Sequence, residues 1–116
     1  MKENIILELT FNFSIKIISL YKILIEQKEF VLSKQLLRSA TSIGANIEEA
    51  NAAQTKKDFI AKMSIASKEA RETRYWLHLL DKSQLVKIDY TNYLTDIEQI
   101  IKILTKIVKT SQENQS

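Results

Sequence analysis

The chain contains almost none of the two residues that build tight turns: Gly44 is its single glycine, and it has no proline. Sharp reversals of the backbone depend on the conformational freedom of glycine and on the fixed φ of proline. A chain of 116 residues that lacks them has few places to turn sharply. The sequence therefore predicts one domain of long helices joined by short loops, an all-α fold.

Apolar residues recur at alternating spacings of three and four in four segments, the pattern of amphipathic helices. The predicted helices cover about residues 4–27, 31–52, 56–83 and 89–110. Each carries one apolar seam, and short links between such helices favour an antiparallel up-down-up-down four-helix bundle over residues 1–110. Thr55 and Asp89 are predicted to cap the last two helices, and Asn51 to end the second one in a left-handed conformation.

Two parts of this assignment rest on weaker patterns. Residues 9–17 alternate apolar and polar side chains, which is the period of a strand, but the helical period continues over five turns and no turn residues bound the alternation. We therefore expect helix there. Residues 111–116 are polar and lack apolar anchors, so we expect a frayed tail.

Several classes of function lack the residues they need. The chain has no cysteine, no glycine-rich phosphate loop and a single histidine, His78. Di-metal bundles use Glu-x-x-His on two helices, and Tyr75 stands three residues before that histidine. No metal, cofactor or catalytic site is expected, and the chain is not expected to be an enzyme. No segment resembles a signal peptide or a membrane span, so we expect a cytoplasmic location and no membrane partner.

The second predicted helix carries two neighbouring stripes. Its apolar stripe comprises Leu36, Ala40, Ile43, Ile47 and Ala50, and its polar stripe Gln35, Ser39, Ser42, Asn46 and Glu49. Solvated helix faces usually consist of Lys, Glu and Arg, so a stripe of small polar residues indicates close packing or binding. The packing interpretation predicts that Arg38, Asn46, Glu49 and Glu72 are paired, either between the second and third helices or with a neighbouring subunit. The alternative is a small-ligand site that uses Ser39, Asn46 and Glu49.

The helices carry more apolar residues than one bundle core requires. Those outside the predicted seams include Phe11, Ile18, Tyr21, Ile65, Tyr75 and Trp76. A monomeric bundle needs one apolar face per helix, so this excess predicts self-association.

The net charge of +3 is confined to residues 55–83. Four cations of this segment share one face opposite its apolar seam: Lys57, Lys68, Arg71 and Lys82. The stripe is either a solvated face or, when repeated in an oligomer, a weak contact for RNA or DNA.

Two segments carry a resemblance to a known family. Residues 35–49, QLLRSATSIGANIEE, resemble the central motif of the bacterial four-helix-bundle family of 23S rRNA-intervening-sequence proteins, and residues 55–59 and 65–77 resemble its third helix. A similar bundle, the accessory variability protein of diversity-generating retroelements, is a pentameric ring that binds nucleic acid. The resemblance implies a homopentamer without known catalysis. The residues that match the family's polar pattern are Arg38, Ser39, Ser42, Asn46, Glu49 and Glu72.

These observations together predict a non-catalytic, oligomeric helical adaptor. Its candidate partners are a second copy of itself, RNA or DNA, and another protein. A bundle that binds a small ligand through the polar stripe remains the alternative.

Overall fold

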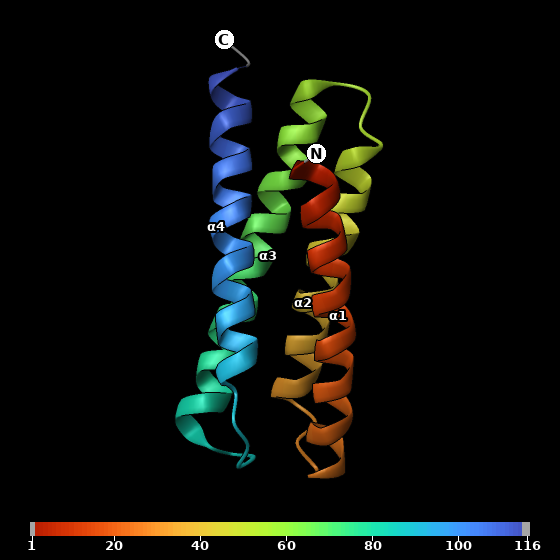
Figure 1. Ribbon diagram of the computed structural model, residues 1–116. Helices are drawn as coiled ribbons and strands as arrows, with labels where there is room; N and C mark the ends of the chain where they lie inside the picture. The colour runs from red at the N-terminus through yellow and green to blue at the C-terminus, as the bar shows by residue number, and fades with distance from the viewer. Residues whose placement is uncertain (1, 115–116) are drawn as a thin grey trace.

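The computed structural model describes residues 2–114, with side chains from residue 5 onward. The chain forms four long helices. They lie side by side in alternating directions (Figure 1). They are α1 (Lys2–Glu26), α2 (Leu32–Asn51), α3 (Lys56–Ser83) and α4 (Thr91–Glu113). The predicted all-α, up-down-up-down bundle is confirmed.

Helices that follow one another in the chain pack against one another. The last helix, α4, closes the bundle against α1, and these two approach each other less extensively than the other neighbouring pairs. The result is a rod with principal-axis extents of 49 × 21 × 21 Å. The start of α1 and the end of α4 lie at the same end of the rod (Figure 1).

The predicted seams form the core. In α1 the residues of the predicted helical seam are buried. Phe11 and Ile15, which belong to the alternating apolar and polar pattern, point outward. The helical period therefore decides the structure of residues 9–17. The seam of α2 is also buried, from Leu36 to Ala50. In α3, Phe59 is only half-buried, and its neighbour Ile60 is buried.

The link between α1 and α2 is organised by Glu29. Its carboxylate accepts hydrogen bonds from the backbone N–H groups of Val31, Leu32 and Ser33, at 3.0, 3.0 and 2.6 Å. The Ser33 hydroxyl in turn donates to the Glu29 carbonyl at 2.7 Å. The first N–H groups of a helix have no partner within the helix, and its positive dipole end favours an anion. One carboxylate therefore satisfies three donors and fixes the start of α2.

The other helix ends follow the predictions in part. The hydroxyl oxygen of Thr55 accepts from the Asp58 N–H at 3.0 Å, which confirms that cap. Asp89 accepts from Thr91 N–H and hydroxyl groups, and these hydrogen bonds lower the pKa of Asp89. Helix α2 ends at Asn51, as predicted. The prediction of a left-handed conformation there is wrong: Ala52, which follows, has φ −93°, and among the described non-glycine residues only Lys28 and Gln84 have a positive φ.

The predicted fraying of the tail is wrong for its first residues. Helix α4 continues to Glu113, and the small Ser111 side chain is buried at the end of the bundle. Residues 115 and 116 lie outside the described part of the chain.

Tyr90 anchors the start of α4 in the core. Its ring is buried, its hydroxyl donates to the Val86 carbonyl at 2.9 Å, and burial raises the pKa of Tyr90 to about 12.

Among the described helices, none is both long and apolar enough to cross a membrane.

Candidate functional site

The polar stripe of α2 lies toward α3, and Arg38, next to Ser39 of the stripe, binds two acidic side chains of α3. The guanidinium group of Arg38 donates to the carboxylate of Glu69 at 3.3 Å and also to that of Glu72. The indole N–H of Trp76 donates to the same Glu72 carboxylate at 3.0 Å. Arg38 therefore bridges two acidic side chains that stand one turn apart on α3.

Ser39 and Thr73 form the buried part of this contact. Their hydroxyl oxygens lie 2.9 Å apart, and both side chains are fully buried. Thr73 also reaches the carbonyl of Glu69 at 2.8 Å, and Ser39 that of Leu36 at 3.3 Å. Each buried hydroxyl is thus satisfied, which avoids the cost of an unpaired polar group in the core.

The remaining residues of the stripe divide between two roles. Glu49 pairs with Lys62 of α3 at 2.9 Å, and this hydrogen bond raises the pKa of Lys62. Ser42 and Asn46 stay within α2, since the Ser42 hydroxyl donates to the Arg38 carbonyl and the Asn46 amide to the Ser42 carbonyl. The predicted pairing between helices is therefore found for three of its four residues and not for Asn46.

We call this contact, formed by Arg38, Ser39 and Glu49 with Lys62, Glu69, Glu72 and Thr73, the α2–α3 seam. Its acidic side chains are already occupied by cations. The described residues hold no group of three or more side chains that could bind a metal ion. The seam is thus a packed, ion-paired helix contact, in which two cations face three carboxylates.

A second feature is the apolar outer face of α1. Phe11, Ile15 and Ile18 share this face and are 64%, 51% and 37% exposed. Of the other residues predicted for self-association, Ile65 and Tyr75 are exposed at 41% and 57%. Tyr21 and Trp76 are half-buried.

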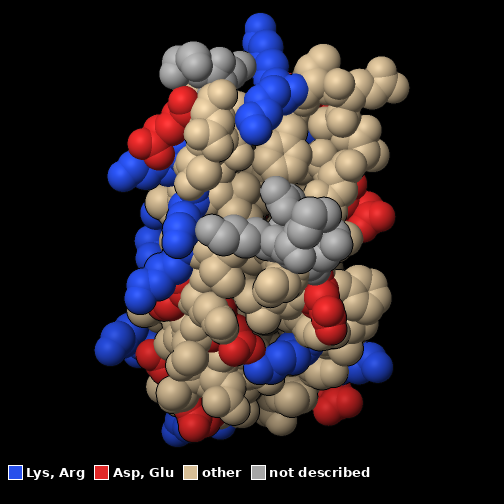
Figure 2. All heavy atoms as spheres, turned by 45° about the horizontal axis from the view of Figure 1, so that its top comes forward, with Lys and Arg blue, Asp and Glu red and all other residues tan. Residues whose placement is uncertain are grey.

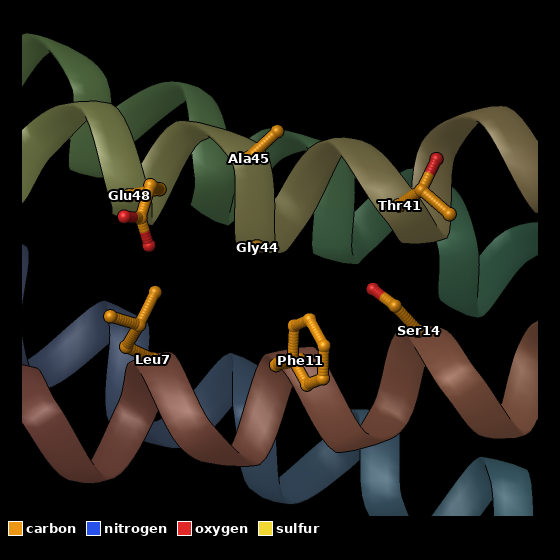
Figure 3. A pocket seen from close by; sticks show the side chains of 7 residues that line it. All are labelled: Leu7, Phe11, Ser14, Thr41, Gly44, Ala45 and Glu48. Atoms are coloured by element: carbon orange, nitrogen blue, oxygen red, sulfur yellow. The ribbon is translucent and has the colours of Figure 1, made fainter.

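A hollow of about 350 Å³ borders this outer face, between α1 and α2. Leu7, Phe11 and Ser14 rise from α1 toward α2, and Glu48 of α2 reaches back toward them (Figure 3). Gly44 leaves the middle of the hollow open. A Cβ atom at that position would lie 3.6 Å from Thr10 Oγ1, an ordinary contact, so close helix packing does not require glycine there.

The predicted basic stripe of α3 is exposed but not continuous. Lys57 and Lys82 stand near opposite ends of the helix, about 38 Å apart at the helical rise. Lys68 and Arg71 lie in its middle, where the Arg71 guanidinium donates to the hydroxyl of Thr105 on α4 at 3.0 Å.

That hydrogen bond places Lys68 and Arg71 beside three lysines of α4 that were not predicted as site residues. Lys102, Lys106 and Lys109 follow one another on α4 at spacings of four and three and are exposed. Figure 2 shows basic side chains in a row along one side of the molecule. Their helical spacing is visible in the sequence. The net charge of residues 84–116 hides it, because four acidic residues balance the four basic ones. We call the five cations together the α3–α4 basic face.

Comparisons with known proteins agree with the sequence resemblance. The family model described as 23S rRNA-intervening sequence protein matches residues 2–106. A crystal structure from Bacteroides thetaiotaomicron VPI-5482, of a protein with unknown function from the S23 ribosomal protein family, is 50% identical. The match covers 94% of this chain and 99% of that one, with a TM-score of 0.88. No curated protein matches the chain. The chain belongs to the family of 23S rRNA-intervening sequence proteins.

Proposed function

We propose that this protein is a non-catalytic adaptor that assembles with copies of itself through the outer face of α1. The observation that carries the proposal is the exposure of Phe11, Ile15 and Ile18 on one face, although α1 already supplies a complete seam to the core. Three large apolar side chains in a row are costly to leave in water, and such patches mark contact surfaces.

The position of a second exposed residue supports a ring. Ile65 lies on α3, which does not pack against α1 and therefore occupies the opposite corner of the bundle. A contact between different surfaces of successive copies is heterologous, and it closes into a ring when the rotation between copies allows. The family resemblance favours five copies.

An adaptor also needs a surface for its partner. Assembly through α1 and the Ile65 side of α3 would leave available the side of α3 that lies next to α4, and this side carries the α3–α4 basic face together with α4. RNA, DNA and an acidic protein are the partner classes that a basic surface favours.

The small-ligand alternative is less well supported by the geometry. Two of the three residues it requires are engaged with α3, Ser39 by Thr73 and Glu49 by Lys62. The third, Asn46, donates to its own helix. These contacts favour a packing role for the polar stripe.

Light scattering tests self-assembly directly. We expect a mass near five chains for the parent at micromolar concentration, and a shift toward smaller species for Phe11→Ser with Ile15→Ser. The matched control is Phe30→Ser with Leu85→Ser, which removes two equally large exposed side chains from the loops. A monomeric parent, or equal dissociation of both variants, contradicts assembly through α1.

A further inference from the structure

The five cations of the α3–α4 basic face differ in their neighbours from four other cations of the bundle. Lys16, Arg38, Lys62 and Arg74 each pair with a carboxylate across a helix contact. Within the described part of the chain, none of the five forms an ion pair with a carboxylate. Their charges are therefore not cancelled inside the protein.

The three lysines on α4 form a line. Lys102, Lys106 and Lys109 span about 10 Å along the helix axis, and no acidic residue occurs between Glu98 and Glu113. Glu98 is occupied by Arg74 at 3.0 Å. The lysines are thus a continuous run of positive charge bounded by an acidic residue at each end.

The α3 side adds two cations and one aromatic ring. Lys68, Arg71 and Tyr75 share one face of α3 at spacings of three and four, and Tyr75 is 57% exposed. The hydrogen bond from Arg71 to Thr105 holds this side against the lysines of α4. The ring of Tyr75 packs edge-on against Trp76, with 5.1 Å between centroids, which restricts its orientation.

We propose that the α3–α4 basic face binds the sugar-phosphate backbone of single-stranded nucleic acid, with Tyr75 as a stacking platform for a base. Unpaired cations in a line match the repeated charges of a phosphodiester chain. An exposed aromatic ring beside such a line is the arrangement that binds single strands without reading their sequence.

The same face does not fit a membrane surface. A helix that lies on a bilayer needs apolar side chains beside its cations. Of the apolar residues of α4 beside its lysines, Ile101, Leu104 and Ile107 are buried in the bundle, and Ile103 and Val108 are half-buried.

The inference deepens the adaptor function proposed above and rests on it, because it names the class of partner. It is tested with the full chain and a short fluorescent single-stranded RNA, by anisotropy at low salt. The test variant is the triple substitution Lys102→Gln, Lys106→Gln and Lys109→Gln. The matched control is Lys22→Gln, Lys34→Gln and Lys87→Gln, which changes the net charge equally at exposed lysines elsewhere.

We expect the test variant to lose most of its affinity and the control to keep most of it. Five phosphate contacts give a slope of log K against log salt of about −3.5, and the test variant should retain a slope of about −1.4. Equal losses in the two triple variants would show that net charge, not this face, attracts RNA, and would overturn the proposal.

Tyr75→Ala tests the stacking contribution. We expect it to weaken single-stranded RNA binding by about tenfold and to leave a duplex of the same length unaffected. A parent that prefers the duplex, an equal loss with both ligands, or an affinity for vesicles of anionic lipid that exceeds its affinity for RNA overturns the single-strand assignment. Light scattering on the same samples reports assembly separately, so a failure of binding is distinguishable from a failure of self-association.

Discussion

The α2–α3 seam and the α3–α4 basic face are built on the same helix but use charge in opposite ways. In the seam, Arg38 lies between two carboxylates and a buried pair of hydroxyls completes the contact. On the basic face, cations from α3 and α4 lie together without a carboxylate among them. The seam therefore contributes to the stability of the bundle, whereas the basic face leaves its charge available to a partner.

The largest effect on stability is expected in the apolar core of α3. Leu77 of α3 is fully buried, so Leu77→Ala should lower the free energy of unfolding by about 2–5 kcal/mol through lost apolar contacts and a cavity. Urea denaturation followed by circular dichroism measures the change. Binding of RNA to the folded fraction should not change. A loss below about 1 kcal/mol would show that this part of the core collapses without cost.

The buried hydroxyl pair should have the next largest effect. Ser39→Ala removes one partner of Thr73 and is expected to lower the free energy of unfolding by about 1 kcal/mol. Ser42→Ala is the matched control, because its hydroxyl bonds only to the backbone of its own helix. If the two variants are equally stable in urea denaturation, the hydrogen bond between α2 and α3 contributes nothing.

The ion pairs of the seam should contribute less. Arg38→Ala leaves Glu69 and Glu72 without their cation, but Arg38 is half exposed, so we expect a loss of about 0.5–1 kcal/mol at low salt. The loss should shrink as salt screens the charges. Lys34→Ala, one turn earlier on α2 and exposed, serves as the control. A loss that is independent of salt would indicate packing by the arginine stem instead.

The smallest effect on stability is expected on the basic face. The triple glutamine variant at Lys102, Lys106 and Lys109 should change the free energy of unfolding by less than about 0.5 kcal/mol, because exposed side chains without partners contribute little. Thermal and urea unfolding of the parent and the variant check this. A loss comparable to that of Ser39→Ala would place these lysines in the structural framework.

The sequence was sufficient for the helices but not for their contacts. Helical spacing identified the seams, because each buried stripe repeats over several turns. It could not give the register between the helices, so the partners of Arg38, Arg71 and Arg74 could not be assigned from it. The structure assigns Arg38 to Glu69 and Glu72, Arg71 to Thr105, and Arg74 to Glu98.

Local sequence patterns do not reveal two features, the cap of α2 and the basic face. Glu29 caps α2 from two residues before the N-cap position, Val31, whereas the usual capping residues Ser, Thr, Asp and Asn stand at the N-cap itself, so no familiar pattern marks it. The lysines of α4 did have the required spacing, but their role beside Lys68 and Arg71 depends on the contact between two helices. Surfaces shared by two elements are the part of the molecule that a linear pattern describes least.

The dependence of RNA affinity on salt tests the contrast between the two regions most directly. For the parent chain we predict that log K falls with log salt with a slope of about −3.5, which corresponds to the five cations of the basic face. Arg38→Ala, which removes a cation from the seam, should leave that slope unchanged. A slope near zero for the parent, or an equal reduction of the slope by Arg38→Ala and by Lys106→Gln, would contradict the division of charge between a structural seam and a binding face.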